Sequence, residues 1–505
     1  MVKLKRNIPK ETLANVAYQE SVSSLPEKVL QIGEGNFLRG FVDWMIHQMN
    51  KQGIFNGSVV AVQPTPHGRV LPKLKEQDWL YTVILRGMAD GKKVDEGEVI
   101  PVISRGLNPY EQWQQVLETA ASKELELIIS NTTEAGITYI KEPYQEDSSP
   151  LSFPGKLTAL LYHRYKQFAG DERAGLHILP CELVEENGGK LKYIVKRIAR
   201  DWELPPDFLH WLEASNRFYD TLVDRIVTGY PKSDSTAFTK RLGYEDDFIT
   251  VGEPYHLFCI NGPEEIKQVF PLDQAGLRVK WGDIEQYREL KVRLLNGPHT
   301  LMASTGYLAG ANTVLEVMKD ETLRTFIERG FEEIIDSLSL DRKKTFEYAE
   351  QVKERFLNPY NHHYLQDIGM NAVYKFKSRL LPTLSRYAEK NGTLPNAIAL
   401  SLAAILVFFR PVETNEKGIV GERNGINYQT RESELVNKVL TECWEEFSQD
   451  RISLEEFVFT VLGNRAIWEE DLNEIELLTQ TVSAYIRQIL SAGMQDTLKQ
   501  MLYQN

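Results

Sequence analysis

A lysine, an asparagine and a histidine lie close together in the segment 291–299, which reads Lys-Val-Arg-Leu-Leu-Asn-Gly-Pro-His. An amine that gains or loses a proton, with two polar side chains beside it, suits proton transfer to or from a carbonyl or alcohol oxygen. On a regular helix, at about 100° per residue, Asn296 would lie about 140° and His299 about 80° from Lys291. Proline interrupts helices, so we expect one helix to end just before Pro298 and another to begin there, which would direct Asn296 and His299 into one pocket. The alternative is a surface lysine, an Asn-Gly turn and a core histidine.

A glycine-rich turn far upstream, at 33–40, follows the apolar run 28–32 and precedes a segment with helical spacing. Gly33 and Gly35 would let the backbone approach a pyrophosphate, whose charge is attracted by the free N–H groups of a helix N-terminus. The spacing departs from the usual dinucleotide-binding pattern, and the simpler interpretation is a tight strand–helix turn.

A second polar turn, at 130–136, follows the buried strand predicted at 125–130. Ligands of doubly wound sheets bind beyond the carboxyl ends of the strands, so polar side chains here could contact the nicotinamide end of a dinucleotide. The alternative is a turn that Thr132 or Thr133 caps. The strand predicted at 58–62 ends in Gln63-Pro64, without a carboxylate for the adenosine ribose, and this leaves NAD and NADP both open.

Three further groups of polar residues stand out. Asp224 and Arg225 interrupt an apolar run, and a buried ion pair and an active-site pair explain them equally well. Lys375 and Arg379 are four residues apart and could hold a carboxylate from one helix face, although such a pair is usually solvated. The doublet His362-His363 has no third ligand nearby in the sequence, so we expect no metal site there.

The first half of the chain alternates strand-like and helix-like segments, which predicts βαβ units and a mostly parallel sheet. The predicted strands are 28–32, 58–62, 80–86, 99–104, 125–130 and 177–180, and the predicted helices are 37–49, 109–122, 154–168 and 189–202.

The second half has few β-branched runs, and apolar residues recur there at helical steps of three and four, as in 321–335. We therefore expect an α/β domain over 1–282 followed by an all-α domain over 283–505. The polar stretch 411–430 reads as an exposed loop. Lys291 would then lie just past the junction, where small-molecule sites concentrate.

The net charge of −13 argues against a nucleic-acid partner, which needs a basic surface. Three widely separated cysteines, Cys181, Cys259 and Cys443, suggest reduced, mostly buried thiols. The N-terminus lacks the apolar stretch of a signal peptide, and the longest apolar helix candidate, 398–409, is too short to cross a membrane. We expect a cytoplasmic protein without a membrane partner, either a monomer or a small homo-oligomer.

Taken together, these motifs resemble the polyol-specific long-chain dehydrogenases typified by mannitol dehydrogenase. The resemblance rests on Gly33-x-Gly35-Asn36-Phe37-x-Arg39, Thr133-Glu134, Val223-Asp224-Arg225-Ile226 and Lys291-x4-Asn296-Gly297-x-His299, and it covers nearly the whole chain in the expected order. Within the family, the segments 31–43, 130–137, 180–183, 221–231 and 355–360 are most similar to the tagaturonate reductase (altronate oxidoreductase) branch.

The resemblance implies a Rossmann-type N-terminal domain, a helical C-terminal domain and a metal-independent reduction of a hexuronate ketone with NAD as cofactor. It implies Lys291 as the acid/base, with Asn296 and His299 as groups that polarise the substrate oxygen. The carboxylate of such a substrate needs a cation, and our candidate is Lys375 or Arg379. The implied cofactor-binding residues are Ile32, Gly33, Gly35, Asn36, Phe37, Arg39, Thr133, Glu134 and Asp224. Leu183 stands where mannitol-type members carry a second carbonyl-contacting asparagine, which favours a hexuronate over mannitol; fructuronate and mannitol remain as alternative substrates, and a non-catalytic dinucleotide-binding protein is a remote alternative.

Overall fold

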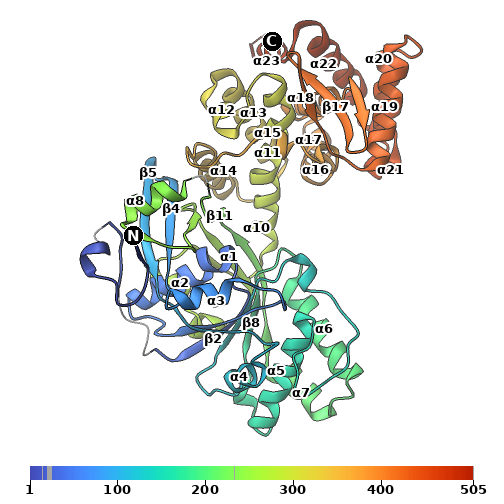
Figure 1. Ribbon diagram of the computed structural model, residues 1–505. Coiled ribbons are helices and arrows are strands. Elements are labelled where there is room, and N and C mark those ends of the chain that lie inside the picture. The colour runs from blue at the N-terminus through green and yellow to red at the C-terminus, as the bar shows by residue number, and fades with distance from the viewer. Residues whose placement is uncertain (14, 20–24, 233, 504–505) are drawn as a thin grey trace. The chain divides into compact units, whose positions relative to one another are not determined.

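The computed structural model describes residues 1–13, 15–19, 25–232 and 234–503. It divides into two compact units, Met1–Tyr287 and Arg288–Asn505 (Figure 1). No helix in the described part of the chain combines the length and the apolar character that crossing a membrane requires.

The first unit is built around a six-stranded sheet with the order β6-β3-β2-β7-β8-β9, in which all neighbours are parallel. The strands are β2 (Glu27–Ile32), β3 (Ser58–Val62), β6 (Ile103–Leu107), β7 (Leu127–Ser130), β8 (His177–Pro180) and β9 (Arg217–Phe218). Counted along the chain, this is the order 3-2-1-4-5-6 of a dinucleotide-binding fold. The strand order reverses beside β2, so the turns that follow β2 and β7 lie next to each other at one edge.

Helices cover both faces of this sheet because its central strands are apolar on both sides. Val29 of β2 packs into a core with α1 (Asn36–Gly40), α2 (Val42–Lys51) and α3 (Val70–Glu76). Leu30 and Ile32 point into the opposite core, which is formed with α4 (Trp113–Ala120), α5 (Phe153–Gln167), α6 (Asn187–Asp201) and α7 (Pro206–Ser215). The α/β fold expected for this half is confirmed.

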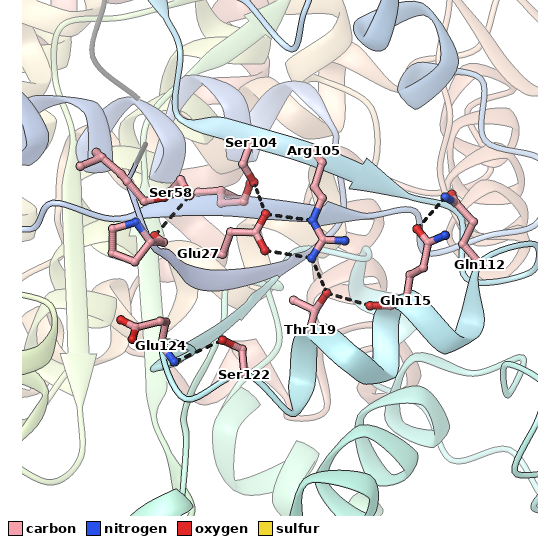
Figure 2. Close-up of polar contacts among 12 residues, drawn as sticks. Glu27, Ser58, Ser104, Arg105, Gln112, Gln115, Thr119, Ser122 and Glu124 are labelled. Atoms are coloured by element: carbon pink, nitrogen blue, oxygen red, sulfur yellow. Dashed lines mark hydrogen bonds and ion pairs between the residues drawn. The ribbon is translucent and has the colours of Figure 1, made fainter. Parts of the chain in front are cut away.

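An ion pair fixes the sheet at the amino ends of its strands (Figure 2). Arg105 of β6 reaches across β3 and donates twice, at 2.8 Å each, to the carboxylate of Glu27 on β2. The same guanidinium donates to Thr119 Oγ1 of α4 at 2.9 Å, and Ser104 Oγ donates to Glu27 at 2.8 Å. These bonds, with Arg105 first, hold the pKa of Glu27 below its usual value.

Smaller sheets complete the first unit. The mixed sheet β11-β13-β4-β5 comprises β4 (Tyr81–Ala89), β5 (Lys92–Ile100), β11 (Val227–Gly229) and β13 (Thr250–Gly252), and the sheet β10-β14-β15 comprises β10 (Asp220–Asp224), β14 (Leu257–Asn261) and β15 (Val279–Trp281). A parallel pair joins β1 (Val2–Lys3) to β12 (Tyr244–Glu245), and two short helices, α8 (Ser235–Leu242) and α9 (Ile266–Val269), lie between strands.

The single strand expected at 99–104 was wrong, since the segment falls across the end of β5 and the start of β6. Pro101 stands between these strands, and proline cannot donate to a ladder.

The second unit is mainly helical, as expected. Its helices are α11 (Gly297–Leu308), α12 (Val314–Lys319), α13 (Glu321–Ser337), α14 (Arg342–Phe356), α15 (Leu365–Ile368), α16 (Ala372–Arg379), α17 (Leu381–Asn391), α18 (Asn396–Phe408), α19 (Glu434–Ser448), α20 (Leu454–Leu462), α21 (Arg465–Trp468), α22 (Leu478–Ala492) and α23 (Met494–Tyr503). The apolar helix α18 is buried over nearly its whole length, and it packs against α11, α13 and α22.

The exposed loop expected at 411–430 was wrong, because this segment forms a three-stranded antiparallel sheet of β16 (Glu413–Asn415), β17 (Gly418–Arg423) and β18 (Ile426–Gln429). Asn424 and Gly425 join β17 to β18 with φ of 53° and 79°. An Asn-Gly pair with both residues at positive φ is typical of a tight hairpin turn, so the sequence contained this signal. Tyr428 and Ile419 anchor the small sheet in the core.

Candidate active site

The glycine turn of the first unit lies at the carboxyl end of β2, next to the turn after β7. Gly33 has φ of +119°, and a Cβ there would lie 2.8 Å from the carbonyl oxygen of Asn131. Gly35 is exposed, and a Cβ there would meet nothing within 4 Å. The first glycine is therefore required by the close approach of two turns, whereas the second leaves open backbone that a pyrophosphate can approach.

Side chains around this turn divide into exposed and internal groups. Asn36 is exposed and Phe37 half-buried, while Ile32 is fully buried in the core. Arg39 is only 4% exposed, and its guanidinium donates to the Glu34 carbonyl and, at 2.6 Å, to Asn36 Oδ1. Arg39 thus stabilises the turn from its buried side.

A buried carboxyl that the sequence reading did not single out holds the turn after β7. Glu182 accepts hydrogen bonds from Thr132 N and Oγ1, both at 2.9 Å, and from Ser130 Oγ at 3.0 Å. Burial raises the pKa of Glu182, and these hydrogen bonds oppose the rise. The capped turn considered as the alternative does not form, because Thr132 bonds to Glu182 and Thr133, with φ of 79°, supplies no cap. A carboxyl residue two positions after β8 was the available signal.

The exposed residues Thr133 and Glu134 project from this turn at the same edge of the sheet as Gly35. Leu183, beside Glu182, is 62% exposed. Asp224 ends β10 and is buried. Its neighbour Arg225 donates to the carbonyl oxygens of Glu253 and Gly40, each at 2.8 Å, so Arg225 serves to join backbone segments.

The lysine–asparagine–histidine group lies in the second unit, on one continuous helical path. The segment Lys291–Asn296 is a π-helix, which runs directly into α11 at Gly297, and Asn296 and Gly297 keep helical dihedral angles. The helix break expected before Pro298 was therefore wrong. Pro298 stands in the first turn of α11, directly after the π-helix, so the proline lies within the helical path and does not end it.

The π-helix changes which side chains share a face. Its hydrogen bonds join residue i to residue i+5, so Lys291 and Asn296 stand one turn apart on the same side. Asn296 and His299 are three residues apart at the start of the α-helix, which again places them on one side. A regular helix would have turned Asn296 well away from Lys291.

His299 is buried among other rings and cations. Its ring centroid lies 4.5 Å from that of Phe356 and 4.7 Å from that of His363. Burial, followed by the charges of His363, Arg355 and Arg379, holds the pKa of His299 well below its usual value, and a hydrogen bond to the Leu295 backbone opposes this shift. The imidazole is therefore neutral at physiological pH.

The two cations of α16 are half-buried, which excludes the solvated face considered for them. Arg379 Nη1 lies 3.3 Å from Thr300 Oγ1, and Lys375 Nζ donates to the Ile368 carbonyl at 2.8 Å. Burial lowers the pKa of both, and for Lys375 the charge of Arg379 adds to the effect. Arg355 of α14, 6% exposed, is a third cation near His299 that the sequence reading did not assign to the site.

The cysteines and the possible metal ligands of the chain complete the account of its reactive side chains. Cys181, Cys259 and Cys443 are free and buried, as expected. Among the described residues, no group of three or more histidine, cysteine, aspartate or glutamate side chains is placed to hold a metal ion.

The strand order and the glycine turn define the class: a protein in which a Rossmann-type sheet is followed by a mainly helical unit. Residues 27–273 match the family model described as the mannitol dehydrogenase Rossmann domain, and residues 283–490 match the mannitol dehydrogenase C-terminal domain. The chain belongs to the mannitol dehydrogenase family.

Curated relatives match over nearly their whole length. An altronate oxidoreductase of Halalkalibacterium halodurans is 49% identical over 483 residues, which are 95% of this chain and 94% of the relative. One of Bacillus subtilis is 42% identical over 481 residues, 95% and 96% of the two chains.

Solved structures share the fold at low identity. A substrate-free D-sorbitol dehydrogenase has a TM-score of 0.78 at 20% identity, covering 98% of this chain and all of that one. A Pseudomonas fluorescens mannitol 2-dehydrogenase, solved with NAD and D-mannitol, has a TM-score of 0.68 at 19% identity and full coverage of both chains.

Proposed function

We propose that the protein interconverts tagaturonate and altronate with NAD as cofactor: tagaturonate, NADH and a proton give altronate and NAD⁺, reversibly. The observation that carries the proposal is the identity of 49% and 42% to altronate oxidoreductases over nearly the full length of both chains. The residues of the two turns support it because they could bind the dinucleotide, and those of the π-helix because they include an amine that could transfer the proton.

The dinucleotide would bind at the turns after β2 and β7. Gly33, Gly35, Asn36 and Phe37 would hold its phosphates, because the exposed Gly35 leaves room beside the backbone. Thr133, Glu134 and Asp224 are the polar candidates for its other contacts, while Ile32 and Arg39 would support the turn from within the core. When bound, NADH supplies the hydride that reduces the keto carbon.

The proton would come from Lys291. Its ammonium donates a proton to the former keto oxygen during reduction, and its free amine takes that proton back during oxidation. Asn296 can donate to this oxygen through its amide. His299 is neutral, and with its N–H bonded to the Leu295 carbonyl its second ring nitrogen would accept a hydrogen bond from a substrate hydroxyl.

The substrate carboxylate would meet the positive charge around His299. Arg379 is the better candidate of the two α16 cations, since its guanidinium lies against Thr300 and its charge acts on His299. The three buried free cysteines agree with a reducing compartment, and we place the enzyme in the cytoplasm.

The decisive assay follows NADH oxidation with tagaturonate, fructuronate and fructose in parallel. We expect turnover to be fastest with tagaturonate. Preference for fructuronate or fructose would assign the protein to a sibling activity, and NADH binding without any turnover would leave only a binding protein.

Lys291→Ala tests the acid/base role. We expect kcat to fall by about 10²–10⁴, the usual effect of removing a general acid, while the Kd for NADH stays within about twofold. Lys377→Ala is the matched control, because that lysine pairs with Glu469 at 2.9 Å outside the site. Near wild-type turnover by Lys291→Ala would refute the role.

A further inference from the structure

Two fully buried polar side chains lie in the core beneath the glycine turn. Gln31 of β2 points to the same sheet face as Val29, two residues earlier, and Asp43 lies on α2, which covers this face. Tyr81 O–H donates to Asp43 Oδ2 at 2.9 Å. A buried ionised carboxyl is costly unless its oxygens are well bonded, so the remaining contacts of Asp43 decide its protonation state.

The donors and acceptors around Gln31 leave one proton unassigned. Gln31 Nε2 donates to the Gly33 carbonyl at 3.1 Å, and a carbonyl only accepts, so the amide oxygen must face the other way. The Gln31 side chain is within hydrogen-bonding reach of the Asp43 carboxyl. Gln31 Oε1 and Asp43 Oδ1 are both buried without a hydrogen-bond partner in the described part of the chain. Two acceptors repel each other, whereas a single proton on Asp43 satisfies both.

The charges that face Asp43 are compatible with its protonated form. Burial is the largest influence and raises the pKa of Asp43 to about 7, while the hydrogen bond from Tyr81 and the charge of Arg39 oppose the rise. A hydrogen bond donated by Gln31 would lower this pKa too, but Gln31 Nε2, its donor, is directed at the Gly33 carbonyl. Arg39 also faces Asp246 and Glu34, so its charge is shared among several carboxyl groups. No ion pair within 4 Å between Arg39 and Asp43 occurs among the described residues.

We propose that Asp43 is a protonated positioning residue, which holds the glycine turn in its binding shape through the chain Tyr81–Asp43–Gln31–Gly33. The Asp43 O–H donates to Gln31 Oε1, and Gln31 Nε2 then fixes the direction of the Gly33 carbonyl. This peptide needs fixing because Gly33 adopts a φ of +119° against Asn131. Loss of the proton turns a hydrogen bond into a repulsion and loosens the turn. The proposal rests on the proposed function in that this turn is taken to hold the dinucleotide.

Asp43→Asn separates a protonated from an ionised residue. The amide of the variant donates to Gln31 Oε1 and accepts from Tyr81, as a protonated carboxyl does, but it cannot ionise. Glu34, in the turn itself, has its pKa raised to about 7 by burial, so the comparison is made in a Glu34→Gln background. The Kd for NADH is measured by fluorescence titration from pH 5.5 to pH 9 for Glu34→Gln and for Glu34→Gln with Asp43→Asn.

With Asp43 present, we expect the Kd to rise about tenfold across this range, the effect of one buried hydrogen bond, and with Asp43→Asn to stay at its low-pH value throughout. Asp43→Leu should bind NADH weakly at every pH. If Asp43→Asn binds as weakly as Asp43→Leu, or keeps the pH dependence, the proposal is overturned. The infrared band of a protonated buried carboxyl, which Asp43→Asn should remove, tests the proton without any ligand, so wild-type protein that binds no NADH would count against the proposed function alone.

Discussion

In the second unit, two arginines and a second histidine face one buried histidine. His299 lies near His363, Arg355 and Arg379, and each of these disfavours its protonation. Under the proposed function, the guanidinium groups of Arg355 and Arg379 are the donors that a substrate carboxylate would meet near His299. A neutral hexitol would offer these groups no charged acceptor.

Replacing Arg379 by glutamine should therefore weaken the binding of the acidic substrate in particular. Losing one charge-assisted hydrogen bond costs about 2 kcal/mol, so the KM for tagaturonate should rise roughly thirtyfold, with a smaller change in kcat. Steady-state kinetics of Arg379→Gln beside Lys377→Gln, a cation on the same helix that pairs with Glu469, measures the difference. An unchanged KM in Arg379→Gln would remove this residue from the site.

Helix α18 shows how one element depends on another for its start. Pro395 precedes the helix and supplies no side-chain cap, and the N–H groups of Ala397 and Ile398 donate instead to Glu333 of α13, at 3.0 and 3.1 Å. Burial raises the pKa of Glu333 to about 7, against the opposing effect of these hydrogen bonds. The most buried helix of the unit thus begins at a carboxyl group from a neighbour.

Glu333→Ala should destabilise the fold by about 2–4 kcal/mol, because it leaves two buried N–H groups without an acceptor. The sign of the pH effect follows from the raised pKa. Between about 4.5 and 7 the unfolded chain releases a proton that folded Glu333 retains, so stability falls as pH rises. Wild type should lose roughly 2–3 kcal/mol relative to Glu333→Gln between pH 5 and pH 8, measured by urea unfolding. A constant difference between the two proteins would contradict the raised pKa.

The sequence predicted elements best where a local pattern decides them. The strands β2, β3, β7 and β8 were found because buried parallel strands are short apolar runs. The hairpin at Asn424-Gly425 was missed because the glycines of that stretch were taken as signs of a loop. The group of Arg355, His363 and Arg379 around His299 could not be assembled from sequence, since these residues come from α14, from the segment between α14 and α15, and from α16, which only the tertiary fold brings together.

The whole chain consists of two compact units, so its unfolding need not follow a single transition. NADH at about a hundred times its Kd should stabilise the structure that binds it by about 2.7 kcal/mol. Hydrogen exchange with and without NADH should show the largest added protection in β2, β3 and β7, compared with α20 and α22 as internal controls. Equal protection in both groups, or none in the three strands, would argue against cofactor binding at the glycine turn.

The π-helix at Lys291–Asn296 can be regarded as an ordinary helix that carries one amino acid too many. If the same six residues wound as a regular α-helix, Asn296 would turn about 140° away from Lys291, whereas the wider π-turn keeps the two on one side. The extra residue is thus accommodated by one wider turn, and Lys291 reaches the side of the helix that carries Asn296 and His299.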